Sequence, residues 1–264
     1  MTQEIPTVNE RGHALETWGR VIYLKDRNMR MLKKDLILRN PLQLIDREGE
    51  QALGDGEFGA VLARTGVGKT AFLVQVALNS LLRDNNVLHV SLNDPVNKVV
   101  LWYKEVLADI TRQYNIGQTD ALWEAILPHR LVMTFKVEGF SVPKLEERLN
   151  DLTQQEIFVP KMILVDGFPF DASARESLVF LKDLTKSNGM HAWFAMTTHR
   201  EDPRSRGAIP PPLLEVADLF ELAVQLNPEG EDIHVKTLKD KHPESSRQDL
   251  VLDPSTMLIT DKRS

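Results

Sequence analysis

The sequence contains no cysteine among its 264 residues, and this absence removes several kinds of chemistry. Disulfide bonds, thiolate metal sites and a cysteine nucleophile are all excluded. No apolar run reaches membrane-spanning length, and the first residues, MTQEIPTVNERGH, lack the basic and then apolar order of a signal peptide. We therefore expect a soluble, cytoplasmic protein without a membrane partner.

The chain also lacks net positive charge. Its formal net charge is −6, so overall electrostatics do not favour binding to nucleic acid. The distribution is uneven, since residues 20–40 carry seven basic and two acidic side chains. The basic side chains are those of Arg20, Lys25, Arg27, Arg30, Lys33, Lys34 and Arg39. Such a segment either contacts a partner or a neighbouring subunit, or forms the solvated face of a helix. We expect residues 1–45 to be a basic, mainly helical N-terminal arm, followed by one domain over residues 46–264.

Apolar runs alternate with helical patterns from residue 58 onward, which is typical of an α/β protein. Strands are predicted at 58–63, 87–92, 131–135, 161–165 and 191–196, with helices between them. Beyond residue 219 the pattern changes to several short apolar runs joined by turns, which indicates antiparallel strands. The predicted fold class is α/β, with a mostly parallel central sheet flanked by helices and antiparallel C-terminal strands.

Residues 63–70, ARTGVGKT, match a phosphate-binding loop (Walker A motif) placed between a strand and a helix. Two glycines let the backbone turn its N–H groups toward phosphate oxygens, and the start of the following helix adds its positive dipole end. Lys69 supplies a cation for the β and γ phosphates, and Thr70 offers a hydroxyl to Mg²⁺. The predicted nucleotide-binding residues are Arg64, Thr65, Gly66, Val67, Gly68, Lys69, Thr70 and Ala71.

An acidic partner for the metal follows the apolar run KMILV, at Asp166. An aspartate at the carboxyl end of a buried strand can hold a magnesium ion or its water without disturbing the sheet. The alternative is an ordinary turn aspartate. We predict Thr70 and Asp166 as the metal ligands.

These motifs together resemble the RecA-fold P-loop ATPases, and within them the DnaB-type helicase and KaiC-type branch. The resemblance is carried by RTGVGKTAF, by the acid after MILV, and by ADLFELAVQL followed by IHVKTLKDKH, which is similar to the closing strands of the family. It covers about residues 40–260. It implies a RecA-like domain, ATP and Mg²⁺ as cofactors, and a homo-oligomer in the form of a hexameric ring or a filament.

One expected carboxylate is missing. In that family the second strand ends in a glutamate that orients the attacking water, whereas here Asn93 and then Asp94 follow the strand. Asparagine holds a water but does not accept its proton, and the loss of a general base lowers a rate by roughly 10²–10⁴. Asp94 substitutes for the glutamate, caps the helix that begins at Pro95, or does both at different stages. We expect nucleotide binding with slow hydrolysis.

The resemblance implies further catalytic residues. Thr198 or His199, at the end of the fifth strand, would sense the γ-phosphate, unless these are only polar residues entering a loop. Lys239 and Lys241 alternate along a strand and would reach into the nucleotide site of a neighbouring subunit. The alternative is a solvent-facing lysine pair on an edge strand.

Nucleic acid is a further possible partner, because the family equivalent of HREDPRSRGAIPPP touches single-stranded DNA. Arg200, Arg204 and Arg206 would meet phosphates, although no aromatic residue is interleaved to stack bases. His89, Trp102 and Trp123 are interpreted as core side chains. Three functions stay open: an oligomeric switch or motor with weak ATPase activity, a DNA-directed ATPase that is helicase-like or recombinase-accessory, and a non-hydrolysing nucleotide-binding regulatory scaffold.

Overall fold

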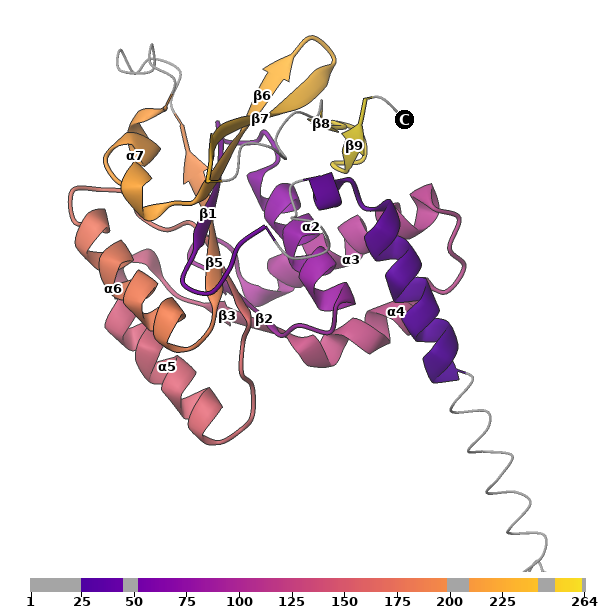
Figure 1. Ribbon diagram of the computed structural model, residues 1–264, viewed down its shortest axis with the longest axis horizontal. Helices are drawn as coiled ribbons and strands as arrows, with labels where there is room; N and C mark the ends of the chain where they lie inside the picture. Colours follow the sequence, from indigo (N-terminus) through magenta and orange to yellow (C-terminus); the bar gives the residue numbers. More distant parts are fainter. Residues whose placement is uncertain (1–24, 45–51, 199–208, 242–249, 263–264) are drawn as a thin grey trace, which may run out of the picture.

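A computed structural model describes residues 25–44, 52–198, 209–241 and 250–262 (Figure 1). Within these residues nine strands form one mixed sheet in the order β3-β2-β4-β5-β1-β6-β7-β8-β9. The strands are β1 Phe58–Ala63, β2 Val87–Ser91, β3 Arg130–Thr134, β4 Met162–Asp166, β5 His191–Thr197, β6 Leu222–Glu229, β7 Asp232–Asp240, β8 Leu250–Leu252 and β9 Ile259–Asp261. The prediction of an α/β fold with a mostly parallel sheet is confirmed.

The C-terminal strands are antiparallel from β7 onward. β7, β8 and β9 each pair in antiparallel fashion with the strand before them in the chain. β6, however, runs parallel to β1, because the chain leaves β5 and returns through α7 (Pro211–Leu214) and η5 (Ala217–Leu219) before it re-enters the sheet beside β1. The expectation of antiparallel C-terminal strands is therefore confirmed for the pairs β6–β7, β7–β8 and β8–β9, while β6 also has a parallel neighbour in β1.

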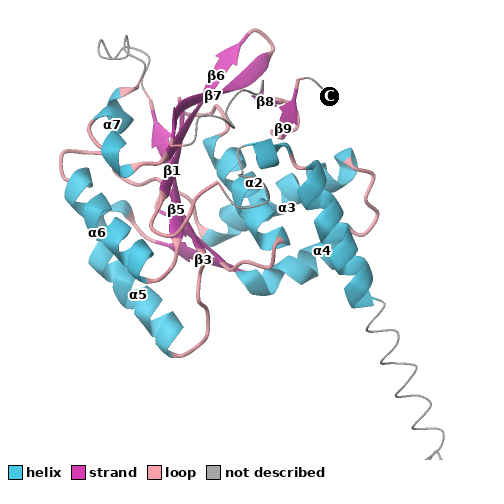
Figure 2. Ribbon diagram, viewed as in Figure 1, coloured by secondary structure: helices cyan, strands magenta, loops and turns pink. Residues whose placement is uncertain are grey.

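Helices cover both faces of the sheet (Figure 2). α2, α3 and α4 lie on one side, and α5 and α6 lie on the other. The bounds are α2 Lys69–Leu82, α3 Val96–Gln113, α4 Thr119–Ile126, α5 Val142–Gln154 and α6 Ala174–Ser187, with short 3-10 turns η1 Pro41–Leu44, η2 Leu127–His129 and η3 Val137–Gly139. Because both faces are buried, the central strands are apolar along their whole length rather than alternating.

The two sides of β1 show how this burial works. Phe58, Ala60 and Leu62 belong to the hydrophobic cluster under α5 and α6, while Val61 and Ala63 belong to the cluster under α2 and α3. Successive residues of a strand point to opposite faces, so one continuous apolar run fills two cores. The strand register also brings carboxyl ends together, since Ser91 pairs with Asp166 and Ala63 pairs with Thr197. Side chains that follow these strands therefore gather at one edge of the sheet.

The helix over residues 25–39, the described part of the predicted basic arm, packs on the domain. Leu36 is buried in the same cluster as α2 and α3. Nζ of Lys33 lies 2.5 Å from Oδ1 of Asp84, and the hydroxyl of Tyr114 donates to the carbonyl of Arg39 at 2.8 Å. The Lys33 ammonium therefore forms an ion pair within the chain. Arg20 lies outside the described residues.

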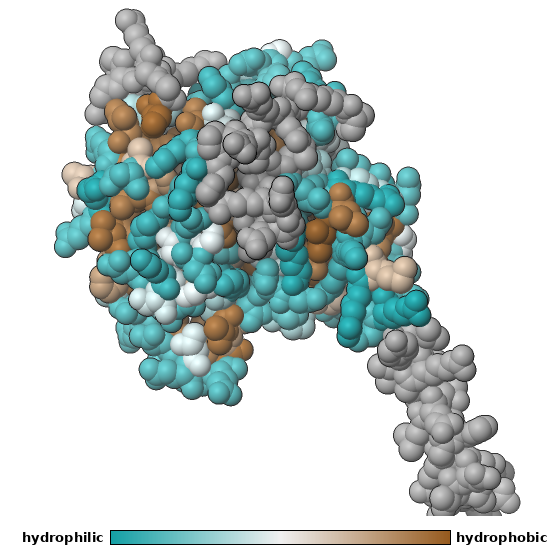
Figure 3. All heavy atoms as spheres, viewed as in Figure 1, coloured by the Kyte–Doolittle hydropathy of each residue, from teal (hydrophilic) through white to brown (hydrophobic). Residues whose placement is uncertain are grey.

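The surface seen in Figure 3 is mostly hydrophilic, with hydrophobic residues gathered near α7. Large hydrophobic side chains that are exposed there and on neighbouring α6 include Leu214, Val179 and Phe180. Within the described ranges, no helix has the length and apolar character needed to cross a bilayer.

Candidate active site

The loop at residues 63–70, called the glycine loop below, joins β1 to α2. Gly66 and Gly68 have φ angles of 81° and 107°, in the left-handed region that glycine adopts without strain. Gly68 immediately precedes α2, and its carbonyl accepts the N–H of Phe72 at 2.9 Å. A Cβ atom at Gly68 would lie only 2.6 Å from Cδ2 of Leu252. The backbone conformation therefore favours glycine at both positions, and packing against Leu252 also requires it at position 68.

Lys69 extends along the inside of the glycine loop. Its Nζ donates to the carbonyl oxygens of Ala63 at 3.1 Å and Arg64 at 3.2 Å. Burial lowers the pKa of Lys69, and the negative charge of Asp166 opposes that shift. Among the described residues, the half-buried ammonium has only neutral carbonyl acceptors in direct hydrogen-bond contact, and these are weaker partners than an anion.

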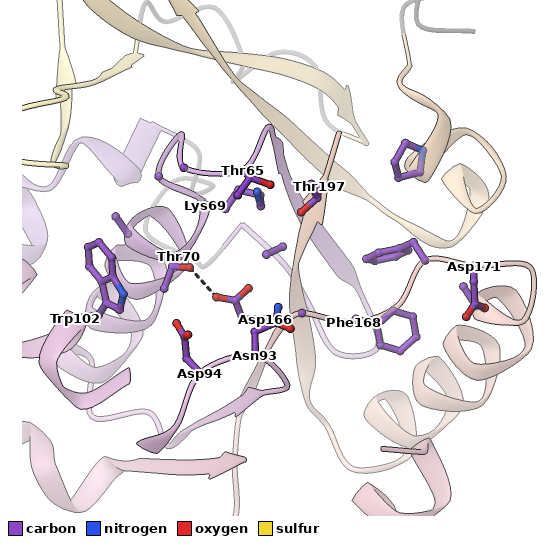
Figure 4. A pocket seen from close by; sticks show the side chains of 18 of the residues that line it. Thr65, Lys69, Thr70, Asn93, Asp94, Trp102, Asp166, Phe168, Asp171 and Thr197 are labelled. Atoms are coloured by element: carbon purple, nitrogen blue, oxygen red, sulfur yellow. Dashed lines mark hydrogen bonds between the residues drawn. The ribbon is translucent and has the colours of Figure 1, made fainter. Parts of the chain in front are cut away.

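Thr70 and Asp166 meet at the centre of the site. The Thr70 hydroxyl donates to Oδ2 of Asp166 at 2.8 Å (Figure 4). Burial raises the pKa of Asp166, while the Thr70 hydrogen bond and the charge of Lys69 act in the opposite direction. In the part of the chain that the structure describes, no group of three or more His, Cys, Asp or Glu side chains is placed to bind a metal. A metal at this point would be held by two protein oxygens and complete its shell elsewhere.

Asn93 lies beside this pair, in the loop after β2. The Leu92 N–H donates to the carbonyl of Asp166 at 2.9 Å, which brings the two strand ends together. Gly167 has a φ of 90°, and a Cβ atom there would lie 2.4 Å from Nδ2 of Asn93. The absence of a side chain at Gly167 is what allows the Asn93 amide to sit against the backbone next to Asp166.

Asp94 points toward Asp166 and Thr70 (Figure 4). Its charge contributes to the raised pKa of Asp166, and its Oδ1 accepts Nζ of Lys98 at 2.8 Å. The prediction that Asp94 caps the next helix is wrong: α3 begins at Val96, Pro95 occupies the cap position, and no side-chain cap bond forms. The Asp94 carboxylate instead pairs with Lys98 one turn into the helix. Its alternative role, as the base, stays a prediction.

A cavity of about 740 Å³ opens over these residues. It connects the glycine loop with the ends of β2, β4 and β5 and with α3, α6 and α7. The predicted site residues that line it are Thr65, Gly66, Gly68, Lys69, Thr70, Ala71, Asn93, Asp94 and Asp166. Arg64, Val67 and Thr198 do not line it. Thr197 does, whereas the Thr198 N–H donates to the carbonyl of Ala63 at 3.0 Å. His199 lies outside the described residues.

Lys239 and Lys241, the predicted catalytic lysines, have partners within the chain and do not line the cavity. Nζ of Lys239 donates to the carbonyl of Ala217, and Nζ of Lys241 lies 2.8 Å from Oε1 of Glu57. β7 ends at Asp240, so Lys241 lies past the strand on which it was expected. Their reach into a neighbouring subunit stays a prediction. Arg200, Arg204 and Arg206, predicted to contact nucleic acid, lie outside the described residues.

The cavity is also lined by residues that were not predicted as part of the site, and two of them, Trp102 and Met257, have large side chains. Trp102 packs against the core cluster under α2 and α3, as expected of a core side chain, but it is only half-buried and also lines the cavity from α3; Met257 lines the cavity from the turn between β8 and β9. The available signal was the spacing of Lys98 and Trp102, which places both on one helix face. His89, by contrast, is fully buried within β2, as expected, and Trp123 packs against the guanidinium of Arg130.

No family model and no curated protein matches this chain. The resemblance to RecA-fold ATPases therefore rests on the sequence motifs alone.

Proposed function

We propose that the protein binds a nucleoside triphosphate together with Mg²⁺ and hydrolyses it slowly. The observation that carries this proposal is the Thr70–Asp166 hydrogen bond, which lies next to the glycine loop and the Lys69 ammonium in one cavity. ATP is the nucleotide that the resemblance to RecA-fold ATPases implies.

The triphosphate would lie on the glycine loop. A loop with two left-handed glycines that opens a helix presents backbone N–H groups and a positive dipole end to an anion. Lys69 would exchange its carbonyl acceptors for phosphate oxygens. That exchange replaces two neutral hydrogen bonds with charge-assisted ones, which are roughly twice as strong.

Magnesium would be held by Thr70 and Asp166. A hydroxyl and a carboxylate are the hard oxygen ligands that Mg²⁺ takes, and the ion commonly keeps several waters and adds substrate phosphate oxygens. The small number of protein ligands therefore fits Mg²⁺ better than a metal that needs a full protein cage. When bound, the ion supplies positive charge that offsets the charge developing on the transferred phosphoryl group.

Slow hydrolysis follows from the residues near the attacking position. Asn93 can orient a water by hydrogen bonding, but its amide does not take up a proton. Asp94 has a carboxylate directed into the site, yet that carboxylate is paired with Lys98 and must exchange this partner for a water before it acts as a base. If this exchange does not occur, the protein binds the nucleotide without hydrolysing it, as the regulatory-scaffold alternative requires.

Steady-state phosphate release by the purified full chain tests the proposal, with ATP and Mg²⁺ and with Mg²⁺ omitted. We expect slow, Mg²⁺-dependent release that is absent from the Lys69→Ala variant. Binding without release would favour a regulatory scaffold, and strong acceleration by single-stranded DNA would favour a DNA-directed ATPase. Absence of both binding and release would contradict the proposal.

A further inference from the structure

The cavity continues past the metal-binding residues along α3. A second, smaller cavity of about 290 Å³ adjoins it, and Trp102 and Met257 line both. The two residues come from different elements, since Trp102 lies on α3 and Met257 lies in the turn between β8 and β9. The two cavities meet at these two residues, and their combined lining extends from the glycine loop to the outer half of α3. We call the two cavities together the α3 groove.

The Met257 side of the α3 groove is attached to α2, the helix that the glycine loop opens. Gln75, a buried residue of α2, donates from Nε2 to the carbonyl of Met257 at 2.9 Å and accepts the N–H of Ile259 at 2.8 Å. Met257 has a φ of 55°, a left-handed conformation that is uncommon outside glycine, and its N–H donates to the carbonyl of Asp253 at 2.7 Å. This wall therefore has a fixed position relative to the glycine loop.

We propose that the α3 groove takes the nucleoside of the bound nucleotide, with the base held between Trp102 and Met257 by stacking. This inference rests on the proposed binding of a triphosphate at the glycine loop. The indole of Trp102 supplies a broad aromatic face, and the Met257 thioether is polarizable and contacts aromatic rings favourably. Ala71, one residue beyond Thr70, also lines the larger cavity, so the groove is continuous with the helix turn nearest the phosphates.

The groove offers little with which to read the edge of a base. Arg112 is paired with Asp109, and the Ser255 hydroxyl donates to Oδ1 of Asp253 at 2.7 Å. The Thr256 hydroxyl accepts the N–H of Leu258, and Glu105 lies on the exposed rim, where water competes for its hydrogen bonds. Stacking tolerates every base, because every base has a π-face. The groove thus accepts purine and pyrimidine nucleotides alike, and the triphosphate dominates recognition.

The test is a calorimetric titration of the full chain, in Mg²⁺, with inorganic tripolyphosphate, ATP, GTP, CTP and UTP. We expect ATP to bind about ten- to a hundredfold more tightly than tripolyphosphate, which is the contribution of one stacked base. We also expect the four nucleotides to fall within about tenfold of one another. Equal affinity for ATP and tripolyphosphate, or a preference above about a hundredfold for one base, would overturn the inference.

A variant series separates stacking from folding. Trp102→Ala should remove the advantage of ATP over tripolyphosphate and leave tripolyphosphate affinity unchanged, and Trp102→Phe should restore most of it. Leu101→Ala, at a neighbouring side chain that is 52% exposed, is the matched control and should change neither affinity. An unchanged advantage in a folded Trp102→Ala variant contradicts the inference alone. If neither tripolyphosphate nor ATP binds to the wild-type chain, the proposed function fails and the inference fails with it.

Discussion

The hydroxyl of Thr70 lies 2.8 Å from Oδ2 of Asp166 and joins the first turn of α2 to the carboxyl end of β4. The two residues are 96 positions apart in the chain. β5 lies between β1 and β4 in the sheet, so this contact between the start of α2 and the end of β4 spans the width of β5. It places a hydroxyl and a carboxylate together where a metal bound to a triphosphate needs both.

Replacing Asp166 should separate metal binding from stability. We expect Asp166→Asn to weaken the Mg²⁺-dependent part of ATP binding by at least about tenfold, because a charged ligand of the ion is lost. The unliganded variant should melt at the same or a higher temperature, since burial already disfavours the ionised carboxylate. Calorimetry with and without Mg²⁺, together with a thermal melt, measures both effects. Unchanged Mg²⁺ dependence would contradict the assigned role.

Lys69 should contribute affinity through its charge. Lys69→Ala should lower affinity for Mg²⁺–ATP roughly ten- to a hundredfold, the value of a hydrogen bond from a charged group to an anion. Lys34→Ala, at an exposed lysine of the N-terminal helix, is the matched control and should bind normally. Equal affinities in the two variants would show that the glycine loop does not hold the phosphates.

Asp94 should affect the rate more than the affinity. If its carboxylate replaces the missing glutamate, Asp94→Asn should lower phosphate release by about 10²–10⁴ and leave ATP affinity within a few-fold of wild type. Single-turnover phosphate release separates the chemical step from product release. A measurable rate that stays the same in the variant would exclude Asp94 as the base.

The two loop glycines should differ in their tolerance of alanine. Gly66→Ala and Gly68→Ala both force a left-handed φ on a residue with a side chain, at a cost of about 1–2 kcal/mol. Only Gly68→Ala also brings a Cβ to 2.6 Å from the buried Leu252, which adds roughly 1–3 kcal/mol of overpacking. Chemical denaturation should therefore show Gly68→Ala as the less stable variant. The opposite order would mean that β8 does not pack on the loop as described.

Acid should destabilise the fold before most carboxylates titrate. His89 and His191 are buried, and burial, with the charges of Arg130 and Lys161 respectively, lowers the pKa of each to about 4. The unfolded chain takes up these protons near pH 6.5 and the folded chain does not, so stability is full above pH 6.5 and falls as pH drops toward 4. The loss is on the order of 2–3 kcal/mol per histidine.

Urea denaturation between pH 7 and pH 4.5 measures this loss. His191→Leu should flatten the dependence of stability on pH, because it removes one of the two buried imidazoles. His234→Gln, at a half-buried position on β7, is the control for removing an imidazole that is not fully buried. A His191→Leu variant with the wild-type slope would contradict the assignment.

Much of the fold around the site could be predicted from the sequence. The strands around β1, the glycine loop and Asp166 all follow from patterns of neighbouring residues, because a strand buried on both faces and a helix after glycines leave local signals. Lys69, Thr70 and Asp166, which were predicted from such signals, lie together in one cavity, whereas Thr198, Lys239 and Lys241, which were predicted from the resemblance, do not line it. The parallel pairing of β6 with β1 could not be predicted from neighbouring residues. It depends on which strand β6 meets after the long connection from β5.

Asp94 and Trp102 have surroundings that their local sequence does not fully predict. Asp94 precedes Pro95 in a good capping sequence, but a lysine one turn later takes the carboxylate instead. Trp102 packs against the core, as its helical periodicity predicts, but the turn at Met257 lies beside it and the two residues also line a cavity. In both cases a partner distant in the chain, or a competing side chain, acts beside the local preference.

The most direct measurement is a crystal structure of the full chain with Mg²⁺ and a non-hydrolysable ATP analogue. The account predicts the triphosphate against the glycine loop and the ion within about 2.1 Å of the Thr70 hydroxyl oxygen, with Asp166 bound to it directly or through one water. An analogue bound elsewhere, or an ion that contacts neither Thr70 nor Asp166, would contradict it.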